Sequence, residues 1–181
     1  MNRFGYEYEQ AKNVVAISPL VSMCCGPLFA AGLSRLGKKP LFLIIDFILS
    51  IGVLMYMRTL DAIPSIAVIG CIAAMGVHYS LFVAIIWPAM TLTIPQSCTA
   101  PALGLATTIQ NLFIAALAYY FGAVNQPRTR QAYDESILSD AVVAFVSLLL
   151  SIWMLVEDLR TGKILSLPEN DKRVGEMRKK M

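Results

Sequence analysis

The chain has 181 residues, of which 57% are hydrophobic and 15% charged, and its mean hydropathy is +0.64. Soluble domains carry charge on about a quarter of their residues, so this composition excludes an ordinary soluble domain and indicates a membrane protein. The formal net charge of +3 comes mostly from loops and chain ends. Scattered charge of this kind argues against a basic face that binds nucleic acid.

Five long apolar segments follow one another, each near the roughly 20 residues that a tilted helix needs to cross the bilayer. Their continuous apolar runs lack the alternation of barrel strands, which favours helices. We therefore predict an all-α integral membrane protein with a luminal or extracellular loop at 1–13, a transmembrane region at 14–156 and a cytosolic tail at 157–181. The predicted spans are 14–33, 41–57, 66–90, 102–124 and 137–156.

The second predicted span carries one acid, Asp46, a few residues in from its start. One interpretation makes Asp46 a charge partner of the basic connection before this span, or an element of a gate. The other makes it a solvated carboxylate near the membrane boundary.

The third span contains two candidate functional side chains. His78 is the single histidine of the chain. Its titration range suits proton sensing in an acidic organelle, although a lone histidine is more often a hydrogen-bonded packing residue. Trp87 precedes Pro88, and proline commonly kinks a helix. Bent helices are where transporters place substrate contacts, and a tryptophan there can hold an ammonium group. The alternative for Trp87 is an aromatic anchor at the membrane interface.

The fourth span has no charged residue, yet it carries Gln110 and Asn111. Amide side chains are expensive inside a bilayer unless they face protein or a watery cavity, so they indicate a polar pathway. Each offers two donors and one acceptor, which match a peptide bond or the termini of a dipeptide. The alternative is that they bridge packed helices.

Enzymatic motifs are missing from the sequence. It has no metal-ligand spacing, nucleophile elbow, phosphate loop or paired buried carboxylates, so we expect neither an enzyme nor a cofactor. The four cysteines lie in or beside apolar stretches without the spacing of a disulfide framework, and we interpret them as small apolar residues. They are Cys24, Cys25, Cys71 and Cys98.

The connection at 32–40, GLSRLGKKP, resembles the short basic loop of the major facilitator superfamily, in which a glycine precedes Asp-Arg-x-Gly-Arg-Arg/Lys. Ser34 stands where the family has its acid, which puts a charge-pair gating role there in doubt. Conformational or gating roles are assigned to the residues that follow the pattern and to the nearby acid: Gly32, Arg35, Gly37, Lys38, Lys39 and Asp46.

The stretch at 94–115 resembles helix eleven of a lysosomal subfamily, with Gly104, Gln110 and Asn111 at its expected positions. The resemblance implies the C-terminal half of a twelve-helix transporter, helices eight to twelve, in the lysosomal membrane. It implies a uniporter that moves dipeptides from lumen to cytosol, with membrane lipid, a glycosylated accessory membrane protein and a homodimeric copy as partners. The residues assigned to substrate binding are Trp87, Gln110, Asn111 and His78.

Two functions stay open. The substrate site of a facilitator lies between two six-helix halves that rock against each other, and five helices supply less than one half. The chain is therefore expected to be part of a dipeptide transporter, or else a truncated membrane module or incomplete gene model that binds a partner without transporting.

Basic residues are distributed unevenly between the two sides of a five-span topology. The first connection and the tail carry ten of the fifteen Lys and Arg residues. The positive-inside rule then places the N-terminus outside or in an organelle lumen and the C-terminus in the cytosol.

This topology predicts that protease added to sealed, right-side-out vesicles spares an epitope placed after Met181. Detergent should expose the same epitope, which controls for its intrinsic resistance. Cleavage in intact vesicles would invert the topology.

Overall fold

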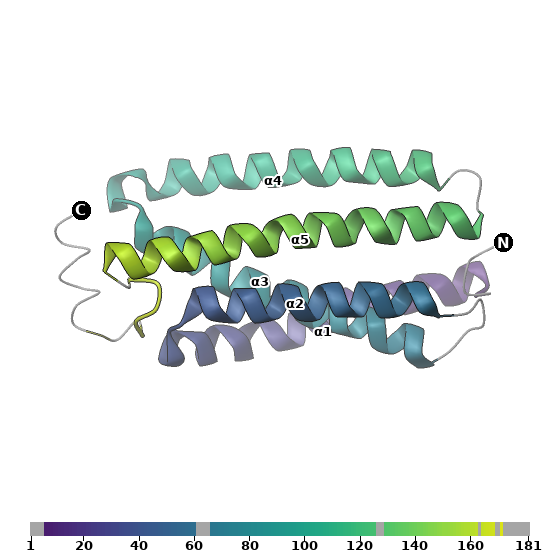
Figure 1. The fold of residues 1–181 in the computed structure, drawn as a ribbon, viewed down its shortest axis with the longest axis horizontal. Coiled ribbons are helices and arrows are strands. Elements are labelled where there is room, and N and C mark those ends of the chain that lie inside the picture. The colour runs from purple at the N-terminus through teal and green to yellow at the C-terminus, as the bar shows by residue number, and fades with distance from the viewer. Residues whose placement is uncertain (1–5, 61–65, 126–128, 163, 169–170, 172–181) are drawn as a thin grey trace.

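The computed structural model describes residues 6–60, 66–125, 129–162, 164–168 and 171, and within them it is all-helical. Successive helices run in opposite directions, so α1 begins and α5 finishes at opposite ends of the bundle (Figure 1). The predicted fold class, a membrane bundle of five long apolar helices, is confirmed. The helices are α1 Tyr8–Leu36, α2 Lys39–Thr59, α3 Ile66–Thr93, α4 Gln96–Val124 and α5 Arg130–Thr161.

The helix α1 starts earlier than hydropathy indicates, because local polar contacts extend it. Residues 8–13 were expected in a loop, but they are helical. The Glu7 amide donates to the Gln10 side chain at 3.4 Å, one half of a capping box, and Glu9 pairs with Lys12 at 2.8 Å. These polar turns lengthen the helix beyond its apolar span. Residues 1–5 of the expected loop lie outside the described residues.

The helices α4 and α5 are also longer than their predicted spans. The helix α4 begins at Gln96, six residues before its predicted span, and passes through Pro101. The Thr129 side chain caps α5 by accepting from the Ala132 amide at 3.2 Å, so that α5 begins at Arg130, seven residues before its predicted span. At the other end α5 continues to Thr161, into the segment expected to be tail.

The helix α2 is central in the bundle, since it packs against both α3 and α5, while α1 packs against α3. Its buried positions recur every three or four residues, which places them along one stripe of the helix. The largest core cluster joins this stripe to the three helices α1, α3 and α5 through Leu33, Leu43, Phe47, Leu54, Ala84, Ile85, Ile137, Ala141 and Ala144.

The helix α4 buries none of its residues and lies along α5 with few contacts (Figure 1). Large apolar side chains such as Leu112, 70% exposed, cover it. Such a surface is unfavourable in water but is solvated in lipid or covered by another apolar helix. With five helices long and apolar enough to cross a membrane, the chain is a multi-pass membrane protein.

Close approach of α1 and α3 depends on Gly76. A β-carbon built at this position would overlap the backbone carbonyl of Ser18 on α1. Small residues let membrane helices approach at backbone distance, where dispersion contacts are densest. Gly70 lies on the same helix and faces open space.

We predict that Gly76→Ala lowers the free energy of unfolding in detergent by about 1–3 kcal/mol, because the added methyl group forces α1 and α3 apart. Gly70→Ala is the matched control, and it should be neutral or stabilise α3 by about 0.5–1 kcal/mol, as expected for alanine in a helix. Circular dichroism melts of the two variants make the comparison. Equal stability would show that the α1–α3 contact is not close-packed.

Candidate functional site

A hydrogen-bonded pair of a carboxyl group and an imidazole ring joins α2 to α3. Asp46 is 4% exposed, and its Oδ2 lies 2.8 Å from His78 Nδ1. A carboxylate inside a membrane helix is costly unless it is paired, and removing one partner leaves a buried charge. The sequence identified both residues but did not pair them. Asp46 is not solvated, and its partner is His78 rather than a cation of the basic connection.

Aromatic side chains pack beside this pair. The Phe47 ring contacts the His78 ring in a T-shaped arrangement with 5.5 Å between centroids, and it contacts the Phe82 ring in the same way at 6.1 Å. One turn further along α2, the Ser50 hydroxyl lies 4.0 Å from the Met75 sulfur. Polar interactions are stronger in such apolar surroundings than in water, so the pair is held firmly in place.

A small groove of about 190 Å³ adjoins the aromatic residues, between α2, α3 and α5. Its two hydroxyl groups are already bonded to their own helix, Ser147 to the Val143 carbonyl at 2.9 Å and Ser151 to the Ser147 carbonyl at 2.7 Å. Ligand pockets usually have volumes of about 300–1,000 Å³. The groove can therefore take one apolar side chain but not a whole dipeptide.

The basic turn between α1 and α2 is ordered and partly buried. Gly37 and Lys38 both have positive φ, 65° and 53°, and Lys39 is 1% exposed. Their neighbour is the segment 164–168 after α5, whose carbonyls accept from the Lys38 and Lys39 amides at 3.0 and 3.3 Å. Arg35 is exposed, and a β-carbon at Gly32 would meet open space.

The remaining predicted site residues lie apart from the pair of Asp46 and His78. Trp87 is half-buried in α3 beside Pro88. On α4, Gln110 is half-buried and Asn111 is exposed. None of these three side chains lines the groove between α2, α3 and α5 or the charged cavity at the end of the bundle.

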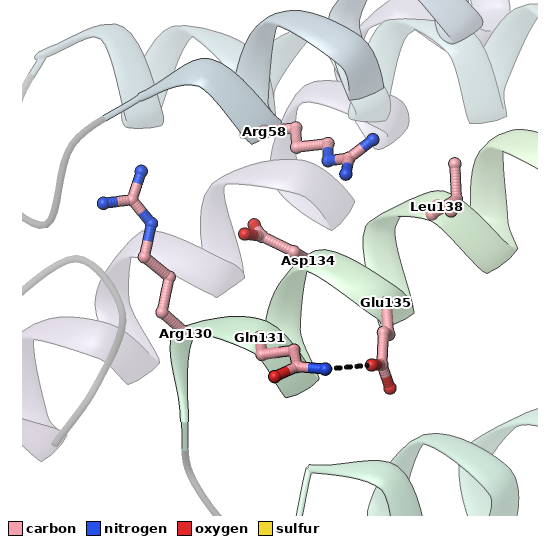
Figure 2. Close-up of a pocket in the computed structure, with 6 residues that line it drawn as sticks. All are labelled: Arg58, Arg130, Gln131, Asp134, Glu135 and Leu138. Carbon is pink, nitrogen blue, oxygen red and sulfur yellow. Dashed lines mark hydrogen bonds between the residues drawn. The ribbon is translucent and has the colours of Figure 1, made fainter.

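A charged cavity of about 510 Å³ lies at the end of the bundle opposite the basic turn. Its lining comes from Arg58, at the end of α2, and from the first turns of α5, Arg130 to Leu138. Figure 2 shows the Asp134 carboxylate between the Arg58 and Arg130 side chains. On its other side, Gln131 Nε2 donates to Glu135 Oε1 at 3.0 Å. The cavity therefore presents both signs of charge.

Sequence reasoning missed this cavity because it treated Arg58 and Arg130 as loop charges. The detectable signal was the spacing of Arg130 and Asp134, which are four residues apart and share one face once the helix begins at Arg130. The role of Arg58 had no such signal, since its place beside α5 depends on the packing of α2.

No family model matches the chain, and no solved structure gives a significant match. Two curated proteins are similar to it, and both are named lysosomal dipeptide transporter MFSD1. The protein from Danio rerio is 23% identical over 124 residues, 68% of this chain and 26% of its own length. That from Gallus gallus is 23% identical over 151 residues, 82% of this chain and 33% of its own length. The chain thus spans about a quarter to a third of relatives that are transporters rather than enzymes.

A double-mutant cycle tests the contact between Asp46 and His78. Asp46→Ala and His78→Ala should each destabilise the bundle, and the double variant should lose less than their sum by about 1–3 kcal/mol, because the hydrogen bond is lost only once. Tyr79, exposed beside His78, supplies the control: Tyr79→Ala and Asp46→Ala should add within about 0.5 kcal/mol. Additive losses for Asp46 and His78 would contradict the pairing.

Proposed function

We propose that these five helices form one bundle of a secondary transporter of the major facilitator type, corresponding to its helices eight to twelve. In this proposal the complete carrier moves dipeptides from the lysosomal lumen to the cytosol as a uniporter. The observation that carries it is the similarity to MFSD1 from two vertebrates over 68% and 82% of the chain. The basic connection at 32–40 supports the same superfamily.

The membrane-embedded pair of Asp46 and His78 supports a transport role. Ionisable residues within membrane helices are rare, and they usually face a pathway or the interior of a bundle. His78 and Asp46 meet at a short distance between α2 and α3, next to Phe47 of the core cluster. We propose that His78 lies beside the substrate path and that Asp46 holds its ring in a fixed orientation.

Substrate contacts are proposed for α4 as well. Its threonine hydroxyls and its side-chain amides differ in whether they are hydrogen-bonded within the protein. The hydroxyls of Thr107 and Thr108 bond to carbonyls of their own helix at 2.8 and 2.9 Å. The side-chain amide groups of Gln110 and Asn111 have no hydrogen bond to another described residue. Amide groups left available on a membrane helix suit the peptide bond and termini of a dipeptide.

The charged cavity of Figure 2 fits this substrate class. A dipeptide is a zwitterion, and the cavity offers guanidinium groups from Arg58 and Arg130 together with the carboxylates of Asp134 and Glu135. By the positive-inside rule this end faces the lumen. We propose that it is an entry vestibule, while Trp87 contacts substrate deeper in α3.

The basic turn is proposed to act in conformational change rather than in binding. Its residues Gly37, Lys38 and Lys39 lie at the expected cytosolic end, with Gly32 and Arg35 on the preceding helix. A second bundle against which these helices rock is part of the proposal, because alternating access needs two rigid bodies. A glycosylated accessory protein and a homodimer stay expectations from the resemblance.

The test uses a complete carrier that contains these residues. Asn111→Ala should lower dipeptide flux about tenfold or more, the factor for losing one hydrogen bond to substrate, without lowering membrane abundance. Thr99→Ala is the control on the same helix, because its hydroxyl is bonded to the Pro95 carbonyl at 3.1 Å and is not available to substrate. Flux is measured as uptake of labelled dipeptide, and abundance by surface labelling. Parallel loss of flux and protein would instead make Asn111 a packing residue.

A further inference from the structure

The segment 164–168, which we name the strap, folds back against the end of α5. The helix stops at Gly162, whose φ of 111° reverses the chain direction. The Asp158 carboxylate then accepts from the Leu165 amide through Oδ1 at 2.8 Å and from the Ser166 hydroxyl through Oδ2 at 2.5 Å. Both of its oxygens are therefore engaged by the strap.

The other side of the strap holds the turn between α1 and α2. The Ser166 carbonyl accepts from the Lys38 amide at 3.0 Å, and the Leu165 carbonyl accepts from the Lys39 amide at 3.3 Å. Gly37 lies so close that an added β-carbon would be 2.7 Å from both the Leu167 carbonyl carbon and the Ser166 oxygen. The strap thus fits a turn that needs glycine for both its backbone conformation and its contact.

The end of α3 completes the contact. The Leu165 side chain is buried against Ala89 and Leu92, in the last turn and a half of α3. This part of α3 directly follows Trp87 and Pro88. The strap therefore joins the ends of α5 and α3 to the turn between α1 and α2.

The position of Asp158 is unfavourable without the strap. It is 4% exposed and lies in the last turn of α5, where the helix dipole disfavours an anion. A buried carboxylate of this kind is stable only when donors satisfy it. The Leu165 amide and the Ser166 hydroxyl supply those donors, so loss of the strap leaves a buried charge without them.

The connection between α1 and α2 has no acid of its own to hold the turn. Ser34 occupies the position where the superfamily pattern has an acid, and its hydroxyl is bonded to the Ala31 carbonyl of its own helix at 3.0 Å. We propose that Asp158 is a positioning residue which, through the strap, holds the α1–α2 turn in place and must release it when the bundle changes conformation. The second half of this statement rests on the transport function proposed for the bundle.

Amide hydrogen exchange of the 181-residue chain in lipid nanodiscs tests the positioning role. Asp158→Ala should speed exchange at Lys38, Lys39 and Leu165 by about tenfold or more, as for the loss of one ordinary hydrogen bond. Gly37→Ala disrupts the same contact between the strap and the turn from the side of the turn, so it should speed exchange at these amides to a similar extent. The double variant Asp158→Ala, Gly37→Ala should exchange little faster than either single variant. The neighbouring exposed acid provides the control, Glu157→Ala, which should leave these amides unchanged.

Unchanged exchange at Lys38 and Lys39 in Asp158→Ala would overturn the proposal. If helical amides of α2 and α3 also exchange faster in Asp158→Ala, the bundle has loosened as a whole. Ser166→Ala then decides whether the strap itself holds the turn. This milder variant removes a single strap contact, and it must speed exchange at the turn while the helices stay protected. Protection of the turn in Ser166→Ala would equally overturn the role of the strap.

Dipeptide flux through a complete carrier separates the two parts of the proposal, that Asp158 holds the turn and that it releases the turn when the bundle changes conformation. A released strap should change the maximal rate of flux more than the half-saturating dipeptide concentration, because the turn does not touch substrate. Faster exchange with unaltered flux would leave Asp158 as a structural residue and overturn its part in conformational change. Absence of flux in the unmodified carrier would instead count against the transport function, while the exchange result stands.

Discussion

The buried carboxylate of Asp46 sets the arrangement of the central helices. A carboxyl group in an apolar bundle needs a hydrogen-bonding partner, and here the partner comes from another helix. The 2.8 Å contact with His78 therefore fixes how far α2 and α3 are rotated and shifted against each other. That register brings Phe47 against His78 and Phe82, and it turns the stripe of α2 towards α3 and α5. The apolar core then fills the space around one polar contact.

Stability is distributed unevenly around this centre. Gly76 lets α1 approach α3 at backbone distance, and the strap joins the ends of α5 and α3 to the α1–α2 turn at the expected cytosolic side. In contrast, α4 contributes no buried residue, and the side-chain amide groups of Gln110 and Asn111 make no hydrogen bond to another described residue. A loosely held helix with available polar groups is the element best suited to move or to meet a second bundle, whereas the strapped end is suited to hold a state until it is released.

The number and type of helices followed from the sequence because length and hydropathy are the physical requirements for crossing a bilayer. Helix ends did not follow, since polar turns such as those around Glu7 and Thr129 are helical through local caps that hydropathy ignores. Asp46 and His78 were each identifiable as polar residues in apolar spans, but they are 32 residues apart and no periodic pattern pairs them. The contacts of Asp158 were missed because a charged residue at the end of a span looks like any solvated tail residue. Only the reversal at Gly162 brings the strap back to it.

In the proposed transporter these helices supply one side of the substrate pathway, with polar groups on α3 and α4 and a charged cavity at one end. Uptake of labelled dipeptides into liposomes tests this view most directly, comparing the purified 181-residue chain with a complete carrier that contains the same residues. The proposal predicts saturable uptake by the carrier that Asn111→Ala reduces, and no uptake by the five-helix chain above that of empty liposomes, because a single bundle leaves the site open. Saturable uptake by the five-helix chain alone, abolished by Trp87→Ala, would contradict the need for a second bundle.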